Sequence, residues 1–370
     1  MRILSVVGTR PQLIKAAALQ PALRAHHDEI LVDTGQHWDE NLAGTFFREL
    51  GLRRAEHSLD AGGGTHAEQT ARMLQALEPI VLAERPEAIL VFGDTNSTLA
   101  GALVAAKAGI PLAHVEAGLR SFDRRMPEEI NRVVADHLAT WLFAPTQTAM
   151  ANLRSEGIVD RVHLVGDLMQ DLAARTVNEV RDPDLLARVP LDQDGRRRLE
   201  AGKYLYATVH RQENREPQAL ADWAGLLSAV ATHDRPVVLA LHPGTRAALQ
   251  RNAIALARDV VTLDPLGYRT SIALQLHAAA VLTDSGGIQR EAAWLNVPCL
   301  VLREVTEWVE AVAESGGRMA LVGLDRRKAV EALERLAPVD DGQRSARERA
   351  ATVVVGNSGA AEAIARALTA

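Results

Sequence analysis

The segment AILVFGDTNSTLAGALVAAKAGIPLAHV, residues 88–115, decides the fold class of this chain. Residues 88–92 are continuously apolar, a Gly-Asp pair ends the run, residues 98–108 are typical of a helix, and residues 112–115 are apolar again. Strands that are apolar at every position, rather than at alternate ones, are typical of a parallel sheet covered by helices on both faces. The segment therefore predicts a strand–helix–strand unit of a doubly wound α/β fold.

The same alternation of strand and helix continues in both directions. Further apolar strands are predicted at 3–7, 30–33, 141–144, 204–209, 237–241, 260–263, 279–283 and 299–302. The 370 residues exceed what one compact core usually holds. We therefore predict two doubly wound, Rossmann-like domains, residues 1–166 and 167–356. An amphipathic helix needs a partner, so the last helix, within 357–370, is expected to pack back on the first domain.

The composition excludes several classes of function. A formal net charge of −6 gives no basic surface for nucleic acid, and 4% aromatic residues argue against stacking of bases. No run of about 18 uninterrupted apolar residues is present, so no membrane partner is expected. The start MRILSVVGTR lacks the pattern of a signal peptide, and the one cysteine, Cys299, cannot form an internal disulfide. These features favour a cytoplasmic location, with Cys299 as a small buried hydrophobe.

Polar residues that directly follow a strand are the candidates for function, because ligands bind there in such sheets. In the loop GTRP at 8–11, Arg10 begins a helix, where a guanidinium and the helix N-terminus suit an anion. Surface capping is the alternative for Arg10, and a solvated position is the alternative for Lys15. Asp94 and Glu116 end apolar strands, where a carboxylate is costly unless it is paired or catalytic. Helix capping is the alternative for Asp94.

The segment MPEEINR at 126–132 contains a second acidic site. Its proline predicts the start of a helix. Glu128 and Arg132 then share one face as an i,i+4 pair, which suits a carboxylate positioned by a guanidinium. The alternative is that the acids only complement the helix dipole. For His114, packing within its strand is the simple interpretation.

In the second domain, His210 and His242 occupy equivalent strand ends. There is no HxxxH pair and no thiolate cluster, so we expect no metal, and donation to phosphate is the better interpretation. Arg303 follows another strand and is a further candidate for phosphate.

The most specific segment is LTDSGGIQRE at 282–291. Ser285, Gly286 and Gly287 lead from a strand into a helix, so backbone amides, a hydroxyl and the helix dipole can bind a phosphate. Glu291, one turn later, can accept from ribose hydroxyls. The segment is not the G-x-S-x-G of a nucleophile elbow. The loop that begins with GTRP at 8–11 does not have the pattern G-x-G-x-x-G, so a dinucleotide cofactor is not expected.

Together these segments resemble one family, the non-hydrolysing UDP-N-acetylglucosamine 2-epimerases, which have the two-domain glycosyltransferase-B type fold with a central cleft. The resemblance runs nearly end to end and rests on GTRP at 8–11, GDTNST at 93–98, HVEAGLRS at 114–121, PEEINR at 127–132, HR at 210–211, HP at 242–243, TDSGGIQ at 283–289 and TEWVE at 306–310. It implies conversion of UDP-N-acetylglucosamine to UDP-N-acetylmannosamine by anti elimination and re-addition of UDP. It also implies that no cofactor is used and that the enzyme is a homodimer.

The resemblance implies roles for individual residues. Asp94, Glu116 and Glu128 match the acid/base carboxylates, and His210 matches a histidine that assists the departing or returning diphosphate. The UDP and charged site positions of the family are matched by Arg10, Lys15, Arg132, His242, Ser285, Gly286, Gly287 and Glu291.

Two departures from the common pattern bear on the substrate and on regulation. Many members read GTRPE, whereas this chain has Gln12. A subgroup with GTRPQ includes enzymes acting on UDP-2,3-diacetamido-2,3-dideoxyglucuronate, so that substrate is an alternative. Some members bind a second UDP-N-acetylglucosamine as an activator through a loop with Gln-His, here Gln36 and His37, although the flanking residues differ. The fold would also suit a glycosyltransferase or a non-catalytic sensor, but neither function needs three carboxylates in the first domain.

Overall fold

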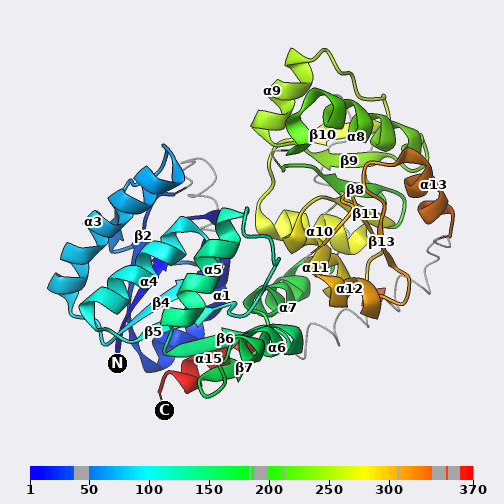
Figure 1. Ribbon diagram of the computed structural model, residues 1–370. Coiled ribbons are helices and arrows are strands. Elements are labelled where there is room, and N and C mark those ends of the chain that lie inside the picture. The colour runs from blue at the N-terminus through cyan, green and yellow to red at the C-terminus, as the bar shows by residue number, and fades with distance from the viewer. Residues whose placement is uncertain are drawn as a thin grey trace. The chain divides into compact units, whose positions relative to one another are not determined.

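The computed structural model describes residues 1–36, 50–182, 186, 199–211, 213–306, 308–335, 347–348 and 359–369. The chain divides into two compact units (Figure 1). The first unit comprises residues 1–172 together with 358–370, and the second comprises residues 173–357.

The first unit is built on a parallel seven-stranded sheet with the order β3-β2-β1-β4-β5-β6-β7. Its strands are β1 (Arg2–Val7), β2 (Asp28–Asp33), β3 (His57–Ser58), β4 (Ala88–Phe92), β5 (Leu112–Val115), β6 (Trp141–Ala144) and β7 (Val162–Leu164). The chain moves outward in one direction from β1 and in the other from β4. The switch point therefore lies between β1 and β4, and ligands bind at the carboxyl ends of the strands at this point in doubly wound sheets.

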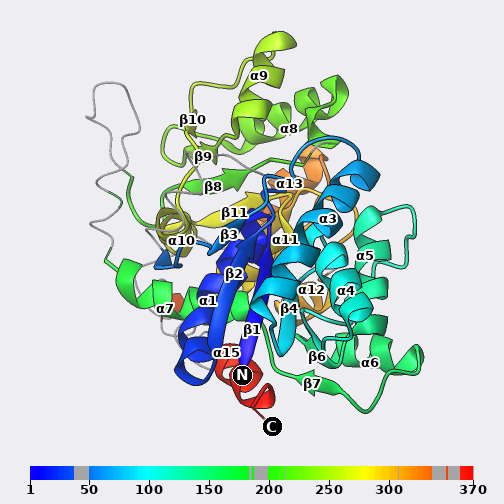
Figure 2. The ribbon, with the colours of Figure 1, turned by 90° about the vertical axis from the view of Figure 1, so that its left-hand side faces the viewer.

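Helices cover both faces of this sheet (Figure 2). They are α1 (Arg10–His26), α3 (His66–Glu84), α4 (Asn96–Ala108), α5 (Pro127–Leu138), α6 (Gln147–Ser155) and α15 (Ala360–Ala367). Helix α7 (Leu168–Val180) begins in this unit and continues into the second. Helix α4 packs between α3 and α5, and α15 packs on α1. Asp171 accepts hydrogen bonds from the backbone amides of Gly359, at 2.9 Å, and Ala361, at 2.8 Å, and so fixes the start of α15. The last helix packs on the first domain, as predicted.

The second unit repeats the plan with a parallel six-stranded sheet of order β10-β9-β8-β11-β12-β13. Its strands are β8 (Leu205–Thr208), β9 (Val237–Ala240), β10 (Val260–Leu263), β11 (Ala280–Thr283), β12 (Cys299–Val301) and β13 (Met319–Leu321). Its α-helices are α8 (Pro217–Val230), α9 (Pro243–Arg251), α10 (Tyr268–His277), α11 (Gly286–Trp294), α12 (Val309–Glu314) and α13 (Arg326–Arg335). The switch point lies between β8 and β11.

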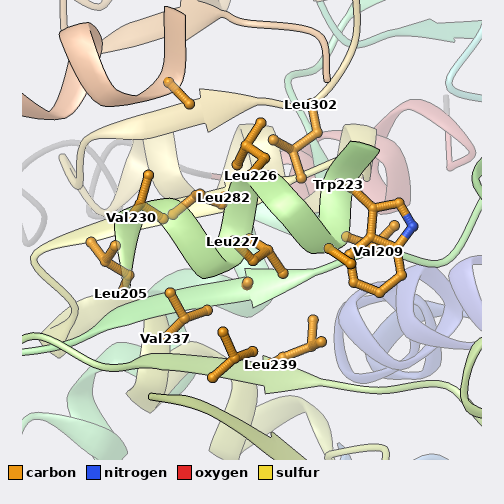
Figure 3. Close-up of a cluster of buried hydrophobic side chains, with 14 of the residues drawn as sticks. Leu205, Val209, Trp223, Leu226, Leu227, Val230, Val237, Leu239, Leu282 and Leu302 are labelled. Atoms are coloured by element: carbon orange, nitrogen blue, oxygen red, sulfur yellow. The ribbon is translucent and has the colours of Figure 1, made fainter. Parts of the chain in front are cut away.

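A continuous apolar cluster joins α8 to this second sheet (Figure 3). Trp223 and Leu227 of α8 are fully buried against Leu205, Leu239 and Leu282. Because each of these strands is apolar toward both faces, the sheet is buried on both sides, as its sequence predicted. The cluster gives the strand ends of the second unit a rigid base.

The predicted α/β class is confirmed, and every predicted strand is present. The sequence did not predict β3, β7 and β13. Each has only two or three residues, and they lie at the edges of their sheets, where a strand needs no continuous apolar run. Cys299 is buried, and burial raises the pKa of its thiol to about 12. Within the described ranges, none of the helices has the length and hydropathy needed to cross a membrane.

Candidate active site

In each unit, candidate residues gather at the switch point of the sheet. In the first unit, the turn after β1 contains Gly8, and the turn after the neighbouring β4 contains Asp94. Glu116 follows β5, which is next to β4. In the second unit, the segment after β8 contains His210, and Asp284 follows the neighbouring β11.

Gly8 is required by close packing at the first switch point. An ideal Cβ on Gly8 would lie 1.9 Å from Thr34 Oγ1 and 2.3 Å from Ser97 Oγ. The Gly8 amide donates to Gln12 Oε1 at 2.9 Å, and Gln12 Nε2 donates to the carbonyl oxygen of Phe92 at 2.7 Å. Gln12 thus joins the loops after β1 and β4, a role that uses both the donor and the acceptor of its amide.

Asp94 forms an ion pair with Arg132. The other terminal nitrogen of Arg132 donates to Glu129 Oε2 at 2.9 Å, so the predicted pair of Glu128 with Arg132 is wrong. Thr95 occupies the N-cap position of α4, so helix capping does not explain Asp94. Burial raises the pKa of the Asp94 carboxyl, and the charge of Arg132 opposes that rise. A carboxyl group with a raised pKa beside a cation is typical of acid/base sites.

Glu116 forms an ion pair with Lys15. The side chain of Glu116 is 12% exposed and that of Lys15 is 8% exposed. Lys15 is therefore not a solvated helix residue. The backbone of Glu116 has a φ of 71°, a conformation that L-residues rarely adopt and that costs about 1–3 kcal/mol. Such strain together with a buried ion pair favours a functional role for Glu116.

The two acids at the start of α5 have different environments. Glu129 is buried and accepts from the backbone amides of Ser121 and Phe122, both at 2.9 Å. Although burial opposes ionisation, these bonds hold the pKa of Glu129 below its ordinary value. Glu128 is half-buried, and its side chain makes no hydrogen bond or ion pair with the residues that the structure describes. This difference favours Glu128 over Glu129 for contact with a ligand.

Gln36 is tied to the segment that follows Asp94. Its Oε1 accepts from the Ser97 amide at 3.0 Å and from Ser97 Oγ at 2.7 Å. His37 lies outside the described residues. A part for the Gln-His pair in binding an activator stays a prediction.

Asp284 is the centre of the second switch point. It is fully buried, and its Oδ2 accepts from the amides of His210, at 3.0 Å, and Arg211, at 2.9 Å. Asn214 Nδ2 donates to the same oxygen at 2.7 Å. The other carboxylate oxygen, Oδ1, lies 3.5 Å from Nδ1 of His210. Asp284 thus holds the segment after β8 and orients the imidazole of His210.

The start of α11 has the geometry expected for an anion site. Ser285 is its N-cap and accepts from the amide of Ile288 at 3.4 Å. Gly286 and Gly287 form the first helical positions, and an ideal Cβ on Gly287 would meet only Ser285 Oγ, at 3.8 Å. The helix dipole favours an anion at this end, and the first turn contains no acidic residue that would repel one.

Glu291, one turn further along α11, is buried and accepts from Gln275 Nε2 at 2.6 Å. Gln275 also lies 3.4 Å from Ser271 Oγ, which is 3.1 Å from the hydroxyl of Tyr206. This chain of polar groups orients one oxygen of Glu291.

Three further candidates lie at helix starts or strand ends. His242 is the N-cap of α9, and its Nδ1 accepts from the Gly244 amide at 3.2 Å. In the neutral ring the proton is therefore on Nε2, which makes that atom a donor. Arg10 is exposed at the first residue of α1, and Arg303 is half-buried after β12.

Some supporting residues were not predicted from the sequence. They are Glu129, Asp136 and Asp284, together with Asn131, whose Nδ2 donates to the carbonyl oxygen of Asp94 at 3.0 Å. A buried acid or amide next to a candidate is a signal that could have indicated them, but only if its burial had been known. Among the described residues, no group of three or more His, Cys, Asp or Glu side chains is arranged to hold a metal ion.

Comparison with known proteins assigns this architecture to a family. The family model described as UDP-N-acetylglucosamine 2-epimerase matches residues 21–369. The UDP-2,3-diacetamido-2,3-dideoxy-D-glucuronate 2-epimerase of Pseudomonas aeruginosa is 44% identical over 337 residues, which are 90% of this chain and 91% of that protein. The UDP-N-acetylglucosamine 2-epimerase of Escherichia coli is 35% identical over 365 residues, covering 95% of this chain and 94% of that protein.

Among solved structures, the chain is similar to UDP-GlcNAc 2-epimerase from Methanocaldococcus jannaschii, crystallised in complex with UDP-GlcNAc and UDP. The TM-score is 0.82 at 34% identity, and the alignment covers 100% of this chain and 99% of that chain. Two Rossmann-like domains of the glycosyltransferase-B type are therefore confirmed.

Proposed function

The chain belongs to the UDP-N-acetylglucosamine 2-epimerase family, and we propose that it epimerises a UDP-2-acetamido sugar at C2. The substrate proposed is UDP-N-acetylglucosamine and the product is UDP-N-acetylmannosamine. Elimination of UDP across C1 and C2 gives a bound glycal, and UDP re-adds after a proton returns to the other face of C2. The observation that carries the proposal is the presence of two carboxylates, Asp94 and Glu116, after adjacent strands. Each forms an ion pair with a cationic side chain.

The chemistry explains why such carboxylates are needed. The acetamido group does not make the C2 proton acidic, so cleavage of the C1–O bond leads and the transition state resembles an oxocarbenium ion. A carboxylate beside C2 then removes the proton, and a second acid returns one to the other face. Asp94, Glu116 and Glu128 are proposed for these steps. Lys15 and Arg132 hold the first two in place.

Release of the diphosphate needs positive charge and oriented amides. The start of α11 at Ser285, Gly286 and Gly287 is proposed to hold the phosphates, with Glu291 on the ribose. His210, oriented by Asp284, is proposed to assist the departing and returning diphosphate. Further phosphate contacts are proposed for Arg10, His242 and Arg303. No cofactor is proposed, because elimination and re-addition of UDP are redox-neutral.

Incubation with UDP-N-acetylglucosamine in deuterated water tests the proposal. An epimerase incorporates deuterium at C2 and forms the manno isomer. Asp94→Asn, Glu116→Gln and Glu128→Gln should each lower turnover by roughly 10²–10⁴-fold, the range for a general acid or base. Release of free sugar, transfer to an acceptor, or near-normal turnover in all three variants would each contradict it.

A second candidate substrate is UDP-2,3-diacetamido-2,3-dideoxyglucuronate. It is favoured by the 44% identity to the Pseudomonas aeruginosa enzyme, against 35% to the Escherichia coli enzyme. Parallel measurement of kcat/KM on both UDP-sugars decides between them, because the higher value identifies the substrate.

Two finer proposals concern the state of the enzyme. We propose that it is a homodimer, which light scattering of the purified protein tests, and a monomer mass would exclude this. We also propose a cytoplasmic location, in keeping with the single buried thiol of Cys299.

A further inference from the structure

A cluster of charged side chains lies inside the first unit, at the ends of β4 and β5. Asp136 of α5 is at its centre and is fully buried, as is His114 of β5. Asp136 Oδ1 lies 2.7 Å from His114 Nδ1, and Asp136 Oδ2 lies 2.7 Å from Arg120 Nη1. At the outer end of the cluster, Arg120 Nε lies 2.7 Å from Glu156 Oε1.

The contacts of His114 fix the orientation of its ring. Its Nδ1 faces the Asp136 carboxylate, and its Nε2 lies 2.7 Å from the carbonyl oxygen of Gly93. A carboxylate and a carbonyl oxygen can only accept, so both ring nitrogens face acceptors. Although burial disfavours the Asp136 ion, His114 and Arg120 hold the pKa of Asp136 below its ordinary value.

The cluster contacts the backbone beside both carboxylates proposed for proton transfer. Gly93, which accepts from His114, immediately precedes Asp94. The amide of Gly118, two residues after Glu116, donates to Asp136 Oδ2 at 3.1 Å. The φ angles are 61° at Gly93, 71° at Glu116 and 82° at Gly118. The two glycines adopt this region without strain, whereas Glu116 between them does so only because surrounding groups fix it.

Stability alone does not account for such a cluster. Replacing a buried ion pair by apolar groups of similar volume is often neutral or stabilising. Hydrogen bonds to Gly93 and Gly118, in contrast, constrain where two strand-end turns lie. We propose that His114 and Asp136 are positioning residues, which set the spacing of the Asp94 and Glu116 carboxylates through the backbone of those two glycines. The inference rests on the proposed function, in which these carboxylates transfer the protons.

The test is Asp136→Asn, with Glu156→Gln as the matched control. Asparagine keeps the shape but cannot accept from His114, Arg120 and Gly118 together. A displacement of about 1 Å can cost roughly 10²-fold in rate, so kcat should fall about 10–100-fold. KM and the affinity for UDP should change by less than about 3-fold, because all the proposed UDP contacts except Arg10 are residues of the second unit, and Arg10 is not part of the cluster. Glu156 is 25% exposed on its side chain, and Glu156→Gln should keep near wild-type turnover.

A second measurement does not depend on the variant folding. In the wild type, nitrogen-15 NMR of the His114 ring should show a proton on Nδ1, the nitrogen that faces the Asp136 carboxylate. A ring without a proton on Nδ1 overturns the inference, and so does a folded Asp136→Asn variant with kcat within about 2-fold of wild type. In either case, exchange at C2 by the wild type would leave the proposed function standing. A wild type that neither exchanges the C2 proton nor forms the manno isomer refutes the proposed function, and this inference with it.

Discussion

Replacement of Asp284 by asparagine tests the centre of the second switch point. In the wild type, Asp284 Oδ2 accepts from the amides of His210 and Arg211 and from Asn214 Nδ2, at distances of 2.7 to 3.0 Å. Asparagine has nearly the same shape, and its oxygen can occupy the Oδ2 position. The three donors therefore keep a partner, but the negative charge is lost.

The size of the effect follows from these contacts. A hydrogen bond to a charged group contributes about 1.5–3 kcal/mol, against about 0.5–1.5 kcal/mol between neutral groups. With three bonds weakened by about 1 kcal/mol each, the free energy of unfolding should fall by roughly 3 kcal/mol. The new amide nitrogen would also face His210 Nδ1, which lies 3.5 Å from Oδ1 in the wild type. It would donate to Nδ1 and remove the negative charge beside the ring, so turnover should fall on the order of 10²-fold.

Urea unfolding followed by tryptophan fluorescence measures the first effect. Trp223 is a suitable reporter, because its ring nitrogen donates to the carbonyl oxygen of Asn214 at 3.0 Å within the cluster of Figure 3. The control is Asp264→Asn, since Asp264 is 91% exposed on its side chain and should change stability by less than about 0.5 kcal/mol. A loss below about 1 kcal/mol in Asp284→Asn, with normal turnover, would refute the reasoning.

Three further predictions concern other parts of the molecule. Burial raises the pKa of Glu29 against the effect of its hydrogen bonds, so its contribution to stability is present at low pH and is lost as the pH rises through the folded-state pKa. Urea titrations should therefore show Glu29→Gln gaining stability relative to wild type between about pH 4 and 7, and a constant difference would contradict this. Gly118→Ala would place a Cβ 2.4 Å from the Ala149 carbonyl oxygen, at a residue whose φ is 82°. Thermal unfolding should therefore show that the free energy of unfolding falls by about 2–4 kcal/mol, and a variant as stable as the wild type would exclude the clash. Gly287→Ala should fold normally, since its Cβ meets only Ser285 Oγ, at 3.8 Å. Calorimetry should nevertheless show UDP binding weakened at least about 10-fold, and an unchanged affinity for UDP would contradict the assignment of this helix start to phosphate.

The central strands could be predicted from the sequence because burial on both faces leaves a continuous apolar run. Residues 88–92 and 112–115 were bounded correctly for this reason. The edge strand β7 (Val162–Leu164) could not be found in this way, since it is partly exposed and has a histidine at its centre. The apolar pattern therefore predicts the middle of a parallel sheet better than its edges.

The candidate residues at strand ends could be predicted, but their partners could not. The turn after a strand is visible in the sequence, so Asp94 and Glu116 were expected at one edge of the sheet. Their cations, Arg132 and Lys15, come from helices whose rotation about their own axes depends on tertiary packing. The role of Asp284 was not predicted for another reason. It lies beside the more conspicuous Ser-Gly-Gly turn, and its Oδ2 accepts from amides of the segment after β8, which is distant in the sequence.

The two consecutive acids of α5 show where a sequence argument must stop. Glu128 and Glu129 differ by about 100° around the helix axis, so only one of them can face the loop that precedes α5. Position in the helix does not say which one, since both suit the first turn equally well, and Glu128 was chosen from its spacing to Arg132 and from the family resemblance. In the structure, the amides of Ser121 and Phe122 and the guanidinium of Arg132 all converge on Glu129. Because Glu129 uses its oxygens to fix this loop and Arg132, it supports the site, and Glu128 is the acid that we propose acts on a substrate.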